Sequence, residues 1–334
     1  MSNSPEGGAS FPLSNGQIDS YANRSPALAT ALRSEELKRI VTAYVRDDKR
    51  SIDAWDRFKK VATALNVSVL ATAAIGASIL VLGLLEQKAP GFTKAAAVFL
   101  GGAGLVIGGY ASACLYELNS GDLAGYWLRS RANAEKLRSE YFDRLVTRVA
   151  GADANTKGAA LDLVIAHLLR DQLDYFAKRG GRHEDAAGHW LRWAAFATGV
   201  ASIGVAAGGM AGLASDAWIY AIAAVGSIGG AIVAFAAAQE QIGQERERAQ
   251  RFRNNVDALE LLARQIDGTR DAIEAGSPDI LTTFTTAINQ QLGLELGRFL
   301  EGGDSVRASI AKLGEQIEAS RKVGKDKPPA QVDH

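Results

Sequence analysis

The sequence has little of the chemistry on which most enzymes and secreted proteins depend. Its 334 residues include one cysteine, four histidines and two methionines. The single cysteine, Cys114, excludes an intramolecular disulfide and a metal site built from cysteines. Residues 1–33 contain no apolar run of the kind found in a signal peptide, so no cleaved leader is expected.

Charge is absent from four long segments, although 22% of the whole chain is charged. A helix needs about 20 apolar residues to cross a hydrocarbon core about 30 Å thick, and the backbone there must be helical because no water satisfies its polar groups. Four paired segments flanked by charge disfavour the alternative of buried helices in a soluble protein. We therefore predict an all-α integral membrane protein with two helical hairpins, whose spans are 61–85, 95–116, 193–215 and 217–239.

Basic residues gather on one side of all four predicted spans. Lys88 and Lys94 are the only bases near the first hairpin tip, and the second tip has none. The positive-inside rule predicts a multi-pass protein with both termini in the cytoplasm. The bases on the cytoplasmic side are Arg46, Lys49, Arg50, Arg57, Lys59, Lys60, Arg129, Arg131, Lys136, Lys178, Arg179, Arg182, Arg192, Arg246, Arg248, Arg251 and Arg253.

The segments after the second and fourth spans share the motif R-x-R-x-N-x-acid-x-L. This repeat predicts an internal duplication, each half having a lead-in helix, a hairpin and an exit helix that continues into the cytoplasm. Apolar residues at helical spacing predict that each exit helix packs against a partner, as in a coiled coil. The motif residues are Arg129, Arg131, Asn133 and Glu135 in the first half and Arg251, Arg253, Asn255 and Asp257 in the second.

Two interpretations of these repeated charges stay open. Arg131 with Glu135, and Arg253 with Asp257, can form i,i+4 pairs on a solvated helix surface, each stabilising the helix by about 0.2–0.5 kcal/mol. The alternative is a role in subunit contacts or signal input.

Composition predicts five regions along the chain. Ser277-Pro278 is typical of a helix start and predicts a helix to about Leu300, followed by a second helix after Asp304. Ser, Gly, Asn and Pro at the amino end, and Lys, Gly and Pro at the other, predict disorder. The regions are a disordered tail 1–34, a first two-span module 35–150, a second 151–268, cytoplasmic helices 269–321 and a disordered tail 322–334.

The predicted spans contain no Asp, Glu, Lys, Arg or His, which disfavours ion-coupled transporters and pumps. They contain glycines four apart, which let helix backbones approach closely within a hairpin or between subunits. Weakly polar residues such as Asn66, Ser68, Thr72 and Ser112 either line a water path in an assembly or bond back to their own helix. The helix-packing candidates are Gly104, Gly108, Gly204, Gly208, Gly226 and Gly230.

Catalytic and metal-binding patterns are missing. His183 and His189 are six apart rather than the four that places two ligands on one helix face. Gly102, Gly104 and Gly108 lie within a span with no preceding strand, so they do not form a nucleotide-binding loop. We expect no enzyme activity, no metal, no cofactor and no nucleic-acid partner.

The duplicated unit resembles the SLATT family, the SMODS- and SLOG-associating two-transmembrane effector domains of bacterial conflict systems. The resemblance covers roughly residues 35–267 and rests on the stretch Tyr126–Glu140, with Asp171–Arg179 before the second hairpin. It implies a homo-oligomeric membrane effector in the bacterial inner membrane, which opens a pore when a nucleotide-sensing or nucleotide-synthesising partner detects infection. This chain departs from many members in having two hairpins and no fused sensor.

These observations predict an anti-phage membrane effector that forms a pore. The alternative is a non-conducting membrane scaffold that recruits partners through its cytoplasmic helices. A small transporter is the least favoured class because the spans carry no charge.

Overall fold

The computed structural model describes residues 11–85, 90–120, 122–185, 192, 195–196, 198–199, 245–298 and 300. Within these ranges every regular element is a helix, which confirms the all-α class. Most of the predicted third and fourth spans lies outside the described residues, as do Gly204, Gly208, Gly226 and Gly230. The predicted helix after Asp304 and the carboxy-terminal tail also lie outside them.

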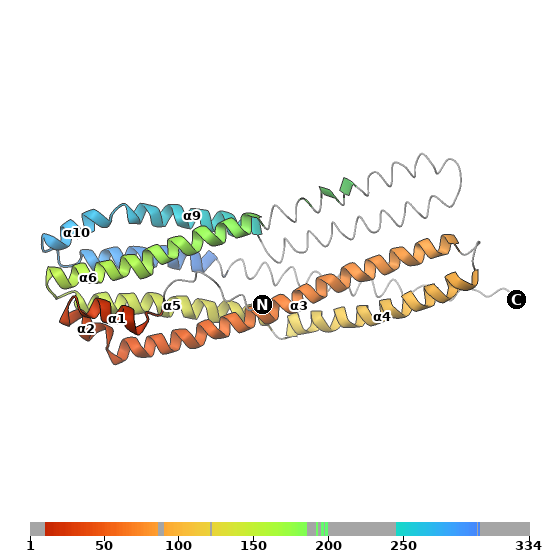
Figure 1. Cartoon of the computed structure of the whole chain (residues 1–334), viewed down its shortest axis with the longest axis horizontal. Helices are drawn as coiled ribbons and strands as arrows, with labels where there is room; N and C mark the ends of the chain where they lie inside the picture. The colour runs from red at the N-terminus through yellow and green to blue at the C-terminus, as the bar shows by residue number, and fades with distance from the viewer. Residues whose placement is uncertain are drawn as a thin grey trace. The chain divides into compact units, whose positions relative to one another are not determined.

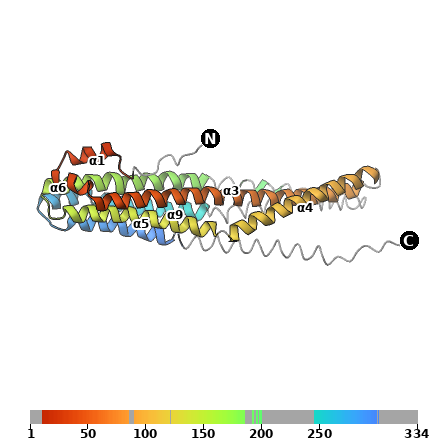
Figure 2. The same cartoon turned by 90° about the horizontal axis from the view of Figure 1, so that it is seen from below.

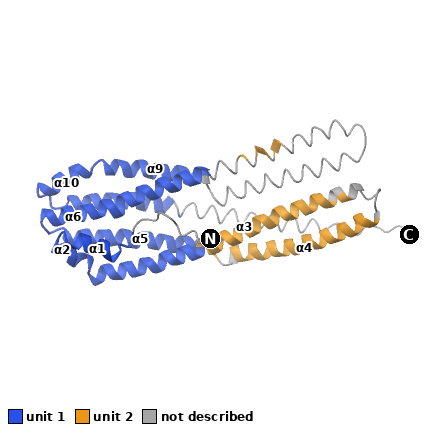
Figure 3. Ribbon diagram, in the orientation of Figure 1, with its two compact units in different colours: residues 1–54, 125–186, 245–302 blue, residues 55–124, 187–244, 303–334 orange. Residues whose placement is uncertain are grey.

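The chain divides into two compact units, coloured in Figure 3. Unit 1 consists of residues 1–54, 125–186 and 245–302, and unit 2 consists of residues 55–124, 187–244 and 303–334.

Unit 1 is a bundle of helices drawn from all parts of the chain (Figures 1 and 2). The helix α6 continues through a π-helical turn, η1, into a further helix at 171–185. The elements are α1 (Asn15–Ala22), α2 (Pro26–Leu32), the first part of α3 (Glu35–Leu85), most of α5 (Leu123–Val149), α6 (Ala154–Val164), η1 (Ile165–Arg170), 171–185, α9 (Glu245–Ala263), α10 (Ile266–Glu274) and 280–298.

One hydrophobic core joins these helices. Tyr141, Phe142 and Leu145 of α5 are at most 2% exposed, and they belong to the same buried cluster as Leu168 of η1 and Leu259 of α9. Each exit helix therefore buries its predicted apolar face, because residues three or four apart lie on one side of a helix. Burial of apolar surface on this scale is the main stabilising contribution to such a bundle.

The amino-terminal segment corrects the prediction of a disordered tail. Residues 11–33 form α1 and α2, and Leu28 is fully buried. Ser14 and Ser25 cap the two helices by accepting backbone N–H bonds, and Phe11 packs against Tyr44 with ring centroids 4.7 Å apart. Serine and proline indicate disorder by composition, but in this segment they start short helices whose apolar residues enter the core.

The carboxy-terminal part of unit 1 contains the helix predicted after Ser277-Pro278. It occupies residues 280–298 and so begins two residues later than the sequence pattern indicates. Leu281, Phe284 and Ile288 of this helix are buried in the core of unit 1. These residues make 280–298 an integral part of the bundle.

Unit 2 contains the second part of α3 and the helix α4 (Pro90–Ser120). Phe58, Ala62 and Leu65 of α3 share a small apolar cluster with Ala111 and Cys114 of α4. Arg57 of α3 donates to Glu117 of α4 at 2.8 Å. The two helices therefore contact each other near this end as an antiparallel hairpin, since the cluster joins the start of one span to the end of the other.

Candidate functional site

Two stretches of helix are long and apolar enough to cross a membrane, and they overlap the first two predicted spans. They lie within Glu35–Ile79 and within Gly91–Val149. Only 28% of the most apolar window of the first, and 11% of that of the second, is buried within the protein. A core helix of a soluble protein would be mostly buried, because its apolar side chains must avoid water.

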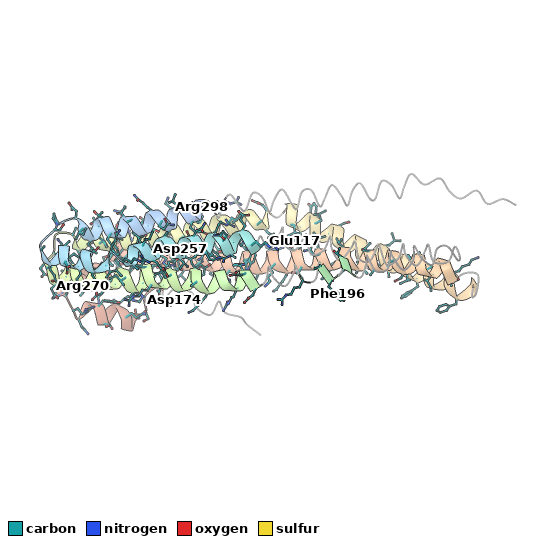
Figure 4. The ribbon with its side chains drawn as sticks, turned by 90° about the horizontal axis from the view of Figure 1, so that it is seen from above. Glu117, Asp174, Phe196, Asp257, Arg270 and Arg298 are labelled. Atoms are coloured by element: carbon teal, nitrogen blue, oxygen red, sulfur yellow. The ribbon has the colours of Figure 1, made fainter. Side chains whose placement is uncertain are left out.

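The helix α4 exposes its largest apolar side chains. Val98, Phe99, Leu105 and Val106 are 73–80% exposed. Phe196, one of the few described residues of the predicted third span, is 65% exposed and is labelled in Figure 4. Such a contiguous apolar surface is typical of contact with lipid or with another protein rather than with water.

The two described glycines of the packing motif differ in their surroundings. A Cβ atom added to Gly104 would lie 3.5 Å from Cγ2 of Ile75 in α3, an ordinary van der Waals distance. A Cβ atom added to Gly108 would have nothing within 4 Å. Gly104 therefore lies at the contact between α3 and α4, whereas Gly108 has room beside it.

Several hydroxyl groups in the described parts of the first two predicted spans bond back to their own helices. Ser68 donates to the carbonyl of Ala64 at 2.8 Å, and Ser112 donates to that of Gly108 at 2.9 Å. Thr72 likewise donates to the Ser68 carbonyl at 2.9 Å. These bonds favour the second of the two interpretations of the polar residues in the spans.

Asn66 is the exception among these polar residues. Its side chain is 3% exposed, and its Nδ2 has no hydrogen-bond partner. An unsatisfied amide in a membrane interior costs several kcal/mol, of the order of 2–7 kcal/mol without compensation. Asn66 is therefore a buried polar side chain whose Nδ2 has no partner, within a mostly apolar hairpin.

The first copy of the repeated motif belongs to a charged network in unit 1. Arg131 donates to Asp48 of α3 at 3.0 Å and also pairs with Glu135, as the i,i+4 spacing predicts. Burial raises the pKa of Asp48, although the neighbouring Arg131 lowers it. Arg129 and Asn133 are exposed. The second arginine and the acid of this copy therefore take part in the charged network.

Arg138 completes the network, and the sequence analysis did not single it out. Its side chain is 2% exposed and donates to the carbonyl of His167 in η1 at 3.0 Å. Its Nη1 lies 3.9 Å from Glu135, and Gln172 accepts from it when the amide is oriented with its oxygen inward. Its spacing could have predicted this role, because Arg138 is seven residues from Arg131 and so lies on the same helix face.

The second copy of the motif lies in a different environment. Here the first arginine, Arg251, is buried and donates to the carbonyl of Arg298 at 2.8 Å. Asn255 is 1% exposed and donates to Glu295 at 2.6 Å, whereas Asp257 is exposed. The partner of Arg253 is Glu184, at 3.6 Å, rather than the Asp257 that the i,i+4 spacing predicts. Figure 4 labels Asp257 and Arg298.

A cavity of about 520 Å³ opens in unit 1 beside both copies of the motif. Four elements contribute to its walls: α5, the helix 171–185, α9 and the helix 280–298. Its charged, amide and aromatic lining residues include Arg131, Asn133, Glu135, Lys136, Asp143, Tyr175, Phe176, Phe252, Asn289, Gln290 and Glu295.

The carboxylates of this cavity already have partners. Asp143 accepts from Asn289 at 2.7 Å, and Glu295 accepts from Asn255. Burial is the main cause that raises the pKa of both acids above the usual range, and these hydrogen bonds oppose it. The cavity is therefore a partly dehydrated environment with a compensated charge distribution.

No group of three or more His, Cys, Asp or Glu suited to a metal ion occurs among the described residues. His183 lies against the ring of Phe252, with centroids 5.4 Å apart, and His189 is outside the described residues.

Comparisons of the chain with protein-family models, with curated proteins and with solved structures find no match. The SLATT resemblance thus rests on the sequence motif, and it stays a prediction.

Proposed function

We propose that this chain is an integral membrane effector of a bacterial defence system, anchored by two hairpins and assembling into a pore when a nucleotide-signalling partner triggers it. The exposed apolar surface of α4 carries the membrane part of the proposal, because side chains such as Leu105 and Phe99 are 80% and 75% exposed. In a bilayer this surface faces lipid, whereas in water it would promote aggregation.

The pore part of the proposal draws support from Asn66. A buried amide without a partner raises the free energy of this packing. A rearrangement of helices that supplies water or a polar neighbour lowers it. The hairpin is therefore suited to two states of different packing. The charge-free spans also argue for a passive pathway rather than for coupled transport.

Release of a fluorescent dye from liposomes tests the pore directly. Purified protein is reconstituted into dye-loaded vesicles of bacterial lipids, alone and together with a candidate nucleotide-synthesising enzyme and its product. Dye release that depends on the partner supports a triggered pore, and cross-linking in the same vesicles measures the homo-oligomer. Intact vesicles in both conditions, with protein inserted, would exclude pore formation.

A non-conducting scaffold is the second candidate. It is favoured by the hydroxyl groups of Ser68, Thr72 and Ser112, which are engaged with their own helices and so leave little polar surface for a water path. In this case the hairpins serve as an anchor, and the bundle of unit 1 recruits partners in the cytoplasm.

Two glycine variants distinguish the candidates. Gly108→Leu adds a side chain where a Cβ atom has nothing within 4 Å, so it should disturb the contact between α3 and α4 less than a substitution at Gly104 does. Gly104→Leu instead forces α3 and α4 apart, since even a Cβ atom contacts Ile75. Loss of dye release in Gly108→Leu, with insertion unchanged, supports a pore assembled through this face. Full partner recruitment by both variants, without any conductance in the wild type, supports the scaffold.

A further inference from the structure

The cavity of unit 1 has the dimensions and the wall chemistry of a small-molecule site. Its volume of about 520 Å³ lies within the range of about 300–1,000 Å³ that is usual for ligand pockets. We propose that it binds a flat, uncharged heteroaromatic compound with hydrogen-bonding groups on its edge. This inference is independent of the pore, because it concerns only the described residues of unit 1.

Aromatic rings form one part of the wall. Phe176 lies 5.4 Å from Tyr175 and 5.5 Å from Phe252, measured between ring centroids. All three rings line the cavity, and Tyr175 and Phe252 are partly exposed, although Arg179 lies over the Tyr175 ring at 5.6 Å and His183 lies beside the Phe252 ring at 5.4 Å. Rings held in place by their neighbours contact flat ligands in offset or edge-to-face geometry.

Amide side chains form another part. Asn133 and Gln290 are exposed lining residues that offer both donors and acceptors. Asn289 also lines the cavity, but its Nδ2 donates to Asp143 and to the Ser139 carbonyl and its Oδ1 is buried, so Asn133 and Gln290 are the amides open to a ligand. This set matches a ligand edge that carries ring nitrogens, amino groups or carbonyls.

The charges of the wall favour an uncharged ligand over a strongly charged one. Arg131 is already paired with Asp48 and Glu135, which leaves Lys136 as the lining cation outside an ion pair. The lining carboxylates outnumber the lining cations by three to two. A phosphate group would meet this acidic excess. A cation would find Glu135, Asp143 and Glu295 already bonded to other side chains.

The test uses the full chain in lipid nanodiscs and two matched pairs of probes: adenosine with its 5′-monophosphate, and riboflavin with its 5′-phosphate. Saturation-transfer NMR detects contact, and titration gives Kd. We expect at least one of the two uncharged probes to bind, and its phosphorylated partner to bind at least tenfold more weakly.

Variants place the bound probe. Phe252→Leu keeps an apolar side chain but removes a ring, and Gln290→Ala removes an exposed amide; the first should weaken binding at least tenfold and the second about threefold. Leu261→Ala, on the same helix as Phe252 but 59% exposed and outside the cavity, should leave Kd unchanged. Unfolding curves check that each variant folds. If Phe252→Leu does not fold, Gln290→Ala alone tests whether the probe binds in the cavity.

Two outcomes would overturn the proposal. One is that neither adenosine nor riboflavin binds in a manner sensitive to these lining substitutions. The other is that a phosphorylated probe binds as tightly as its uncharged partner, which would identify the site as one for anionic ligands.

Discussion

The two units of this protein place the same kinds of side chain in opposite environments. Phe142 and Leu168 in unit 1 are fully buried, whereas Phe99 and Leu105 in unit 2 are 75% and 80% exposed. In unit 1 the apolar residues alternate with charged ones at helical spacing, so one face becomes a core. In unit 2 apolar residues surround the helix. The difference teaches that unit 1 supplies its own apolar interior, while α4 of unit 2 leaves apolar side chains exposed for contact with lipid or with another protein.

A second comparison concerns the two copies of the repeated motif. Arg131 and Glu135 make inward contacts in the first copy, and Arg251 and Asn255 make those of the second, while Arg253 pairs with Glu184 at the surface. The contacting positions are shifted by two residues, which corresponds to a rotation of about 200° around a helix. The same motif therefore contacts its neighbours through different positions in the two halves.

The largest expected effect tests the core of unit 1 against the surface of unit 2. Phe142→Ala should lower the free energy of unfolding by about 3–5 kcal/mol, because it removes a fully buried ring and leaves a cavity. Phe99→Ala should have a much smaller effect, since its ring has few protein neighbours. Thermal unfolding in nanodiscs, followed by near-ultraviolet circular dichroism, measures both. Equal losses would contradict the contrast between the units.

A charge on each surface tests which solvent it meets. Leu105→Arg should impair membrane insertion, because an arginine near the centre of a spanning helix costs about 2.5–3.5 kcal/mol. Leu261→Arg, 59% exposed on α9, should insert as the wild type does. The fraction of protein that resists alkaline extraction from membranes is the readout. Normal insertion of Leu105→Arg would indicate that α4 does not face lipid.

The repeated arginines allow the third test. Arg131→Ala should destabilise unit 1 by about 1–3 kcal/mol, since it leaves Asp48 and Glu135 partly buried without their cation. Arg253→Ala should cost less than about 1 kcal/mol, because its pair with Glu184 is exposed. Comparing their unfolding midpoints tests whether the motif plays equivalent roles; matching losses would support functional equivalence of the two copies.

The smallest effect is a pH dependence of stability. Burial raises the pKa of Glu295, so the folded protein holds this proton more tightly than the unfolded chain does. The resulting stability is present below the unfolded pKa and is lost as the pH rises through the folded one.

Glu295→Gln should therefore gain stability relative to the wild type as the pH rises from about 4 to about 7, by up to about 1 kcal/mol. Glutamine retains an oxygen to accept from Asn255. Glu247→Gln, on an exposed position of α9, is the control that should show no such trend. A constant difference between Glu295→Gln and the wild type across the pH range would refute the prediction.

Much of the local structure followed from periodicity. The faces of the exit helices and the first hairpin could be read because apolar spacing reflects the geometry of a single helix. The helices at 15–22 and 26–32 were missed, because their sequences are short and weakly apolar and become ordered by packing against α3, α5 and α6. The cavity could not be foreseen, since residues from four separate stretches of the chain line it.

By itself the sequence determined that the chain is helical, that long stretches of it carry no charge, and that one motif occurs twice. Those properties depend on neighbouring residues, and composition and spacing record them. Only the tertiary structure decided which residues Arg131 and Arg251 bond to, that Asn66 Nδ2 lacks a partner, and where the cavity lies. These properties depend on the rotation of each helix against its neighbours, which is set by the packing of side chains distant in sequence.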